Sequence, residues 1–379
     1  MKQFKISLAA LLMLVAASCA PKDSFRYCAW IEGKLDMSEE QLENYFQKAS
    51  ECGIDAIYYE CHGGYPEILQ DSTSFRDSAA LTLLRRAAVY ARKYDVELHA
   101  WMWSANRCEK NLREQHHDWY AINRNGESTA DIKLYTREHY RFLCPNNEEA
   151  IDYMKERVRE IAEIDGVTGI HMDFIRYPDA ILPRGLWESR GVYQDQVYPL
   201  YDFCYCDRCR SEYKERTGID PLEMEDPNSS EEWLAFRLEK LADYASEIAS
   251  EIKACGKVSS AAVFATPEQS RQLVRQDWTH FKNVDCYFPM IYNGAYGEPD
   301  EWVETAAREG IEELRALGSE SKLCAGVSGS FKDGRAAKLI ELARNAGADG
   351  ICFFSLKSFE RGECWDELAE AIKADKEAH

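Results

Sequence analysis

The chain has 379 residues, of which 45% are hydrophobic and 30% are charged, and its formal net charge is −20 at pH 7. This length suits one large domain or two small ones, and the hydrophobic fraction is enough for a sizeable core, which argues against a disordered chain. The negative charge argues against nucleic acid as a partner and against direct adsorption to anionic lipid headgroups.

The first segment has the pattern of an export signal. Lys2 and Lys5 precede the apolar run ISLAALLMLVAAS, which ends at Cys19. Basic residues followed by a short apolar run are typical of a signal peptide, and the run is too short to span a bilayer comfortably. The small residues in AASC resemble a bacterial lipobox, which implies cleavage before Cys19 and lipid attachment to its thiol. Ordinary secretion with cleavage nearby is the alternative.

The chain is therefore divided into three parts: a lipoprotein signal peptide (1–18), a tether (19–24) and a folded domain (25–379). No later stretch is long and apolar enough to span a bilayer, so we expect the membrane to be reached through the lipid alone. The expected location is the bacterial cell envelope, either in the periplasm or on the cell surface.

After the tether, short apolar segments alternate with amphipathic segments of helical period. The strand-like segments are 25–33, 55–64, 96–104, 169–179, 257–265, 284–293, 322–330 and 349–356. The helical segments are 38–49, 79–94, 148–164, 231–254, 268–281, 300–318, 334–347 and 363–374. Two long loops, 107–147 and 179–229, follow the third and fourth strands.

This alternation predicts the fold. Strands separated by helices pair in parallel, and eight such units close naturally into a single (β/α)8 barrel, an α/β fold of the TIM type. A doubly wound open sheet is the alternative, but no glycine-rich phosphate turn follows an early strand. In a barrel, functional residues lie at the carboxyl ends of the strands and in the loops that follow.

The fourth strand carries the most telling residues. Side chains alternate along a strand, so His171 and Asp173 share the face opposite to Ile170 and Met172. The apolar face suits packing under helices, which leaves the polar face inside the barrel with Asp173 near the top. Arg176 begins the loop above. A structural ion pair with Arg176 is the alternative to a functional role for Asp173.

Other strand ends add imidazoles, an acid and aromatic rings. The residues expected around the barrel mouth, besides those of the fourth strand, are Trp30, Glu60, His62, His99, Trp101, Trp103, Tyr292 and Asn293. Aromatic faces stack on the apolar side of sugar rings, and carboxylates accept hydrogen bonds from sugar hydroxyls. Core packing is the alternative for any one aromatic residue, so the argument rests on their clustering.

Three stretches carry a family resemblance: HAWMWSANR, the run from Cys144 to Pro178 that ends DGVTGIHMDFIRYP, and VDCYFPMIYN. They resemble the family-10-like glycosyl hydrolases, and the resemblance covers nearly the whole chain after the tether. It implies a (β/α)8 barrel that cleaves a polysaccharide or glycoconjugate, with Asp173 as the main catalytic carboxylate.

Most glycosidases need two carboxyl groups across the scissile bond, with different pKa values. We expect Asp173, beside His171 and Arg176, to be held ionised. The second carboxyl group stays open between Glu60 and Glu268, because the sixth and seventh strands end without an acid. Glu268 has a structural alternative in the first turn of a helix, and a loop acid such as Glu188 is a further option.

The motif CYCDRC supplies three close thiols, Cys204, Cys206 and Cys209. They suit a structural zinc ion with Cys108 or Cys144 as a fourth ligand, or a disulfide that pins the loop and leaves a free thiol. No catalytic metal or other cofactor is expected. The leading hypothesis is thus a lipid-anchored glycoside hydrolase with a glycan substrate, and the alternative is a non-catalytic glycan-binding lipoprotein.

Overall fold

We describe a computed structural model of the chain, which covers residues 24–33, 37–62 and 78–379. The predicted signal peptide, Cys19 and most of the tether lie outside these residues. The side chain of His62 and the turn that follows it also lie outside them. Within the described residues, no helix combines the length and apolar character that a bilayer crossing requires.

The centre of the molecule is a closed barrel in which each strand pairs with its sequence neighbours and the last strand pairs with the first. All pairings are parallel. The strands are β1 (Arg26–Ile31), β2 (Ala56–His62), β3 (Glu97–Trp103), β4 (Val167–Asp173), β5 (Val258–Phe264), β6 (Cys286–Met290), β7 (Lys322–Ser328) and β8 (Gly350–Phe354). The predicted (β/α)8 fold is confirmed.

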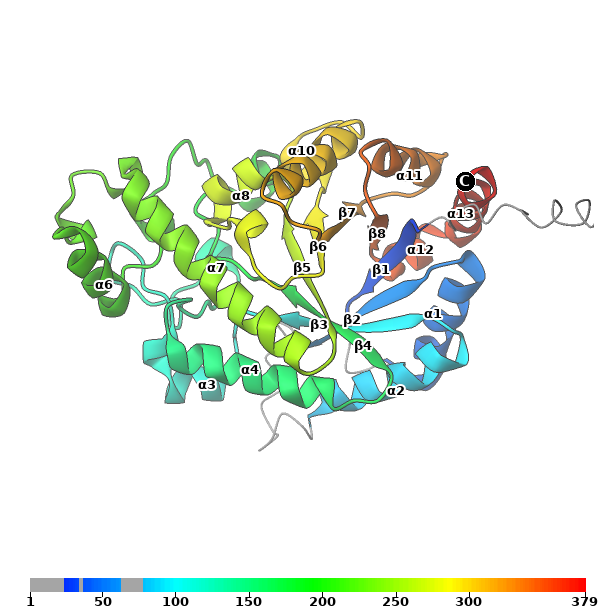
Figure 1. Cartoon of the computed structure of the whole chain (residues 1–379), viewed down its shortest axis with the longest axis horizontal. Helices are drawn as coiled ribbons and strands as arrows, with labels where there is room; N and C mark the ends of the chain where they lie inside the picture. The colour runs from blue at the N-terminus through cyan, green and yellow to red at the C-terminus, as the bar shows by residue number, and fades with distance from the viewer. Residues whose placement is uncertain (1–23, 34–36, 63–77) are drawn as a thin grey trace, which may run out of the picture.

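Helices surround the barrel (Figure 1). The main ones are α1 (Glu39–Cys52), α2 (Ala79–Lys93), α4 (Glu148–Ala162), α7 (Glu231–Ala254), α8 (Pro267–Val274), α10 (Trp302–Ala316), α11 (Arg335–Asn345) and α13 (Trp365–Ala378). Local signals set their ends. Ser38 and Gln41 form a capping box at the start of α1, and Gly53 ends it with a φ of 82°.

The two faces of β4 point to different parts of the molecule, as the alternation of its side chains predicts. Ile170 and Met172 are fully buried in the apolar layer between the sheet and the helices. The opposite face contributes to the barrel interior, where an apolar cluster is built from Cys28, Trp30, Ala56, Tyr58, Trp101, Phe288, Cys324 and Cys352. The interior is therefore a packed core, and the mouth above it is the place for a site.

The loops after β3 and β4 contain structure that the sequence pattern did not predict. They hold α3 (Lys110–Gln115), α5 (Trp187–Arg190) and α6 (Asp207–Thr217). Helix α6 and its flanking turns project to one side of the helix ring (Figure 1). Helix α6 has only Cys209 and Tyr213 buried, so its apolar period is too weak to read from sequence. Two further short helices, α9 (Asn293–Tyr296) and α12 (Leu356–Gly362), follow β6 and β8.

Candidate functional site

A pocket of about 430 Å³ opens at the carboxyl ends of the barrel strands. Its floor comes from strand ends, with Trp30 on β1, Glu60 on β2, Asp173 on β4 and Tyr292 after β6. Its side wall comes from the loops after β3 and β4. This volume lies within the usual range for small-molecule sites, roughly 300–1,000 Å³. The structure therefore brings together Trp30, Glu60, Trp101, Trp103, Asp173, Arg176 and Tyr292 of the sequence-predicted residues.

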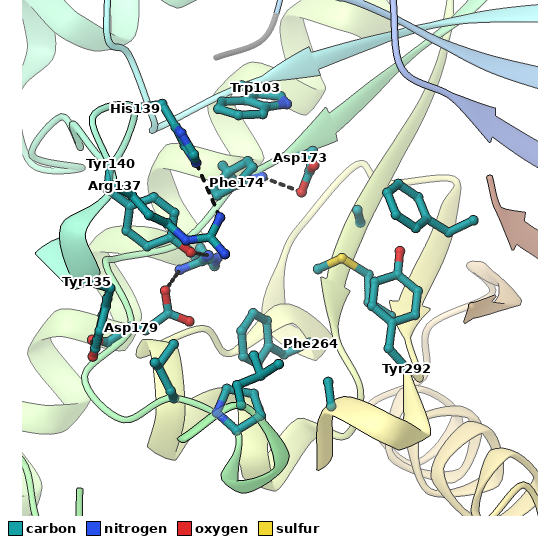
Figure 2. Close-up of a pocket in the computed structure, with 18 of the residues that line it drawn as sticks. Trp103, Tyr135, Arg137, His139, Tyr140, Asp173, Phe174, Asp179, Phe264 and Tyr292 are labelled. Carbon is teal, nitrogen blue, oxygen red and sulfur yellow. Dashed lines mark hydrogen bonds and ion pairs between the residues drawn. The ribbon is translucent and has the colours of Figure 1, made fainter. Parts of the chain in front are cut away.

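Asp173 is held in a fixed orientation at the edge of this pocket. Its Oδ2 accepts a 3.0 Å hydrogen bond from Nε1 of Trp101, and its Oδ1 accepts a 2.6 Å bond from the backbone N–H of Phe174. Figure 2 shows the second of these bonds and places Asp173 across the pocket from Tyr292. A carboxylate with both oxygens engaged is oriented for chemistry at one position.

The surroundings of Asp173 differ in part from the expectation. Burial raises the pKa of Asp173 above its ordinary value, and the Phe174 N–H, the Arg176 charge and the Trp101 N–H oppose this rise. His171 does not contribute, because it contacts Trp30 and not Asp173. The predicted effect of Arg176 on Asp173 is confirmed in direction, whereas the predicted effect of His171 was wrong. Two N–H donors stabilise the charged form against the cost of burial.

Glu60 is the second carboxyl group of the pocket, and it is 6% exposed. Burial, reinforced by the negative charges of Glu32 and Asp173 and opposed by Lys357 and Trp103, raises the pKa of Glu60 to about 8. Its Oε2 has no hydrogen-bond partner among the described residues. At neutral pH Glu60 is therefore mainly protonated, so it can donate a proton.

Glu32 is a third acid at the mouth that sequence reasoning missed. It follows β1 directly and lines the pocket beside Glu60. The two segments pack tightly, since a Cβ on Gly33 would lie 2.1 Å from the carbonyl oxygen of Glu60. The stretch WIEG did indicate this position, because a barrel places the residues that directly follow its strands at its mouth.

His171 lies beneath the pocket and does not line it. Its Nε2 accepts a 3.1 Å hydrogen bond from Nε1 of Trp30, and its Nδ1 lies 2.9 Å from Oγ of Ser260. Because the indole N–H can only donate, the ring proton of neutral His171 belongs on Nδ1, where it donates to Ser260. Burial lowers the pKa of His171 well below its ordinary value. The predicted substrate contact is thus replaced by support of the pocket floor.

Three other predicted residues lie away from the pocket. His99 sits at the opposite end of the barrel, stacked on Tyr58 with ring centroids 4.6 Å apart and with its Nε2 3.4 Å from Glu97. Asn293 begins α9 and its Nδ2 donates to Asp300. Glu268 is exposed in the first turn of α8, where it accepts a hydrogen bond from Gln272. The predicted alternation of side chains along β3 is correct, but alternation alone does not show which inward-facing residue lies at the mouth of the barrel.

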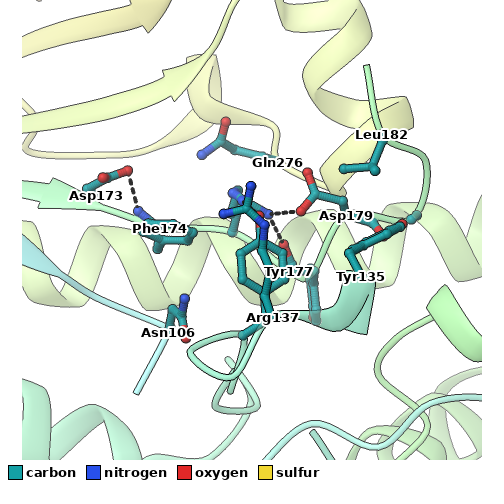
Figure 3. Close-up of polar contacts among 12 residues, drawn as sticks. Asn106, Tyr135, Arg137, Asp173, Phe174, Tyr177, Asp179, Leu182 and Gln276 are labelled. Atoms are coloured by element: carbon teal, nitrogen blue, oxygen red, sulfur yellow. Dashed lines mark hydrogen bonds and ion pairs between the residues drawn. The ribbon is translucent and has the colours of Figure 1, made fainter. Parts of the chain in front are cut away.

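The start of the β4 loop is tied into a buried network. Arg176, which is 6% exposed, donates from Nη1 to Asp179 at 3.1 Å and from Nη2 to the hydroxyl of Tyr140 at 3.2 Å. Figure 3 shows Asp179 and Phe174 on either side of this network, with Gln276 above it, whose Nε2 donates to the carbonyl of Ile175 at 2.9 Å. The predicted substrate residue Arg176 therefore also fixes the loop.

The side wall was not predicted. Its residues come from the loops after β3 and β4 and include Tyr135, Arg137, His139, Tyr140, Asp179, Leu182, Pro183, Leu186 and Arg190. Figure 2 shows Tyr135, Arg137, His139 and Tyr140 gathered on the side of the pocket opposite to Tyr292. Loops of this length have no hydrophobic period, so nothing in the sequence indicated which of their residues face the mouth.

Four cysteines converge beside this wall. The Sγ atoms of Cys144, Cys204, Cys206 and Cys209 all lie within 4.8 Å of one another, and all four residues are buried. Cys144 Sγ is 3.6 Å from Cys206 Sγ and 3.5 Å from Cys209 Sγ. The sequence left Cys108 and Cys144 open as the fourth member of this cluster, and the structure selects Cys144. Cys108 is buried elsewhere as a free thiol.

Comparison with solved structures gives neighbours that share the barrel. The glycoside hydrolase domain of PgaB (BpsB) from Bordetella bronchiseptica superposes with a TM-score of 0.65 and 12% sequence identity, over 92% of this chain and 98% of that one. The catalytic domain of β-amylase from Paenibacillus polymyxa gives 0.62 and 11%, over 89% and 94% of the two chains. α-L-Fucosidase isoenzyme 2 from Paenibacillus thiaminolyticus gives 0.58 and 14%, over 93% and 49%.

These neighbours establish the fold, since sequence identities this low show no more than a shared architecture. No family model and no curated protein sequence matches the chain. The resemblance to the family-10-like glycosyl hydrolases therefore stays a prediction.

Proposed function

We propose that the protein is a glycoside hydrolase that cleaves a polysaccharide or glycoconjugate with Asp173 and Glu60 as its two catalytic carboxyl groups. The observation that carries this proposal is that the two groups share one pocket but have different surroundings. Asp173 accepts two N–H hydrogen bonds, whereas the Oε2 of Glu60 has no partner among the described residues. Such a difference separates the pKa values of the two carboxyl groups, as acid–base catalysis requires.

The chemistry follows from this difference. Glu60, with a pKa of about 8, carries a proton at neutral pH and donates it to the glycosidic oxygen as the bond breaks. Asp173, whose charged form is stabilised by two N–H hydrogen bonds, acts as the anion that attacks the anomeric carbon or activates water. Two carboxyl groups supply this reaction without a cofactor.

The remaining pocket surface suits a sugar. Trp103 packs on Phe174 with ring centroids 4.3 Å apart, and Tyr292 packs on Phe354 at 5.5 Å, so broad aromatic faces border the cavity. Rings of this kind offer apolar faces for the C–H side of a pyranose. The structural neighbours support the proposal at the level of the fold, because those reported above are a glycoside hydrolase domain, a β-amylase and a fucosidase by name.

A screen of complex glycans with product mass spectrometry tests the proposal. The wild-type chain should release products, and Asp173→Asn and Glu60→Gln should each lower the rate by at least about a hundredfold, the scale of acid–base catalysis. Glu268→Gln is a matched control, since Glu268 lies on the exposed start of α8. Full activity in Asp173→Asn and Glu60→Gln would contradict the assignment. Glycan binding without any product would instead support the non-catalytic alternative.

We also propose that the protein is exported and anchored at the cell envelope through a lipid on Cys19. The pattern of Lys2, Lys5, the apolar run and AASC supports this proposal. The mature protein purified from membranes of a bacterial host should begin at Cys19 and carry acyl chains by intact mass. Cys19→Ser should abolish the added mass and release the protein from the membrane fraction. An unmodified Cys19 in the mature wild-type protein would rule the anchor out.

A further inference from the structure

We propose that Cys144, Cys204, Cys206 and Cys209 bind one zinc ion that joins the two loops forming the side wall of the pocket. All four sulfur atoms lie within 4.8 Å of one another, and Cys144 Sγ is 3.6 Å and 3.5 Å from Cys206 Sγ and Cys209 Sγ. A tetrahedral zinc ion with Zn–S bonds of about 2.3 Å separates its sulfur ligands by roughly 3.8 Å. The spacing of the four thiols therefore suits such an ion.

The surroundings of the thiols favour metal-bound thiolates. Cys206 occupies the N-cap position of α6, where the helix dipole stabilises negative charge. The backbone N–H of Ile122 donates a 3.4 Å hydrogen bond to Cys204 Sγ, as outer groups do around metal–thiolate centres. Four sulfur ligands and no histidine or carboxylate select zinc or iron, and four protein ligands leave no open position for catalysis.

The ligands come from two different loops. Cys144 lies four residues after Tyr140 of the pocket wall, in the loop between β3 and α4. The other three lie in the loop after β4, which also supplies Asp179, Leu182 and Arg190 to the wall. One ion would therefore hold both halves of the wall together. The metal would act on the site by positioning, not by contact with substrate.

Metal analysis of the full chain, purified without chelators, tests this proposal. We expect about one zinc per chain by mass spectrometric elemental analysis, and cobalt substitution should give the intense thiolate-to-metal absorption of a tetrahedral S4 site. Cys206→Ser should lose most of the zinc. Cys352→Ser is the matched control, because Cys352 is also buried but lies in the barrel interior. Its zinc content should equal that of the wild type.

Three results would overturn the proposal: wild-type protein with no bound metal after growth in zinc, disulfides among the four cysteines in peptide mapping, or unchanged zinc content in Cys206→Ser. Because metal content is measured on the wild type first, a variant that fails to fold does not leave the question open. None of these measurements depends on glycan cleavage.

The charges that line the pocket support a second, independent inference. Their geometry points to a glycan substrate with an anionic substituent, which is a carboxylate or a sulfate ester. This inference rests on the proposed glycan substrate. The acids Glu32, Glu60 and Asp173 lie at strand ends, whereas Arg137 and Arg190 lie on the loop wall. The pocket is therefore acidic at its floor and basic at its side.

These two arginines are not neutralised by acids. Within the described part of the chain, the side chain of Arg137 contacts Nε2 of His139, 3.4 Å from its Nη1, and the ring of Tyr140, and it has no carboxylate partner. Arg190 is exposed and has no carboxylate partner among the residues the structure describes. By contrast, Arg176 at the same wall is paired with Asp179. In a chain with a net charge of −20, two uncompensated guanidinium groups at one pocket wall attract an anion that the rest of the surface repels.

His139 lines the same wall and lies near both arginines. Burial together with the charges of Arg137 and Arg190 lowers the pKa of His139 to about 4, so its ring is neutral at pH 7. A neutral ring beside two guanidinium groups offers one further N–H donor to a carboxylate or sulfate. Arginine is suited to both groups because its planar fork binds two oxygens at once.

Binding measurements on the catalytically impaired Asp173→Asn variant test this inference without any need for cleavage. Matched oligosaccharides of one length, built from neutral hexoses, uronic acids or sulfated hexoses, are the probes. We expect an anionic set to bind at least about tenfold more tightly than the neutral set, with an affinity that falls as salt rises. The two anionic arms distinguish the carboxylate from the sulfate ester.

Replacing both Arg137 and Arg190 by Gln should abolish the preference for anionic probes. Arg184→Gln is the control, because Arg184 is exposed in the same loop but does not line the pocket. Equal affinity for neutral and anionic probes, or a preference that survives the double substitution, would overturn the inference. Hydrolysis by the wild type, measured separately, decides the proposed function.

Discussion

The indole Nε1 of Trp101 donates a 3.0 Å hydrogen bond to Oδ2 of Asp173, and this bond links the barrel interior to the pocket. Trp101 belongs to the apolar cluster inside the barrel, so its ring cannot move away from the carboxylate. Strand register explains the pairing. Trp103 is the register partner of Asp173, which places Trp101 one inward-facing position below it. The rigid core thus orients the group that is proposed to react.

Trp101→Phe tests this relationship. The substitution keeps an aromatic side chain but removes the donor, so the charged form of Asp173 loses a hydrogen bond of a kind that contributes roughly 1.5–3 kcal/mol. We expect kcat to fall by about tenfold to a hundredfold, and the acidic limb of the pH–rate profile to move to higher pH. Trp119→Phe is the control, because it removes a comparable indole hydrogen bond to Glu149 outside the pocket. It should leave kcat and the acidic limb unchanged. An unshifted acidic limb in Trp101→Phe would refute the role of this bond.

Glu32→Gln probes the origin of the high pKa of Glu60. The charge of Glu32 raises the pKa of Glu60, so its removal should lower that pKa from about 8. As the proton donor, Glu60 should set the alkaline limb of kcat/KM, and the variant should show this limb at lower pH. Glu298→Gln, a change of the same charge outside the pocket, serves as the control. An alkaline limb that does not respond to Glu32→Gln would count against Glu60 as the acid.

Glu60 also predicts how stability depends on pH. Its pKa is about 8 in the folded chain and about 4.3 in an unfolded one, so the folded state binds the proton more tightly. The contribution of neutral Glu60 to the free energy of unfolding is therefore complete below about pH 4.3 and declines as pH rises to about 8. Glu60→Gln does not titrate. In urea titrations, the free energy of unfolding of the wild type relative to this variant should fall across that pH window. A difference that does not change with pH would show that Glu60 has an ordinary pKa in the folded chain.

Arg237→Met tests the buried ion pair that supports the cysteine loop. Nη1 of Arg237 lies 2.6 Å from Oδ1 of Asp202, with side chains 1% and 0% exposed. The substitution leaves a buried charge without its partner, so we expect a loss of about 3–5 kcal/mol in the free energy of unfolding. Arg210→Met breaks a more exposed pair with Asp220 and should cost less than about 1 kcal/mol. Equal losses in the two variants would contradict this distinction.

Much of the fold follows from the sequence alone because it depends on local patterns. Ser38 with Gln41 begins α1 and Gly53 ends it, as the capping signals predict. The alternation of Ile170 and Met172 with His171 and Asp173 identifies the inward face of β4, and that face depends only on the pleat of the strand. The strict succession of strand and helix then allows few arrangements other than a closed parallel barrel.

The tertiary structure decided which of these residues meet. His99 and Trp101 share one face of β3, yet one lies at the lower end of the barrel and the other beneath Asp173, because depth depends on the register between strands. The approach of Cys144 to Cys206 joins residues 62 positions apart. Arg137 and Arg190 reach one pocket wall from loops without hydrophobic period. A sequence states which groups a strand end carries, but distances between loops are set by packing across the whole barrel, which no local pattern encodes.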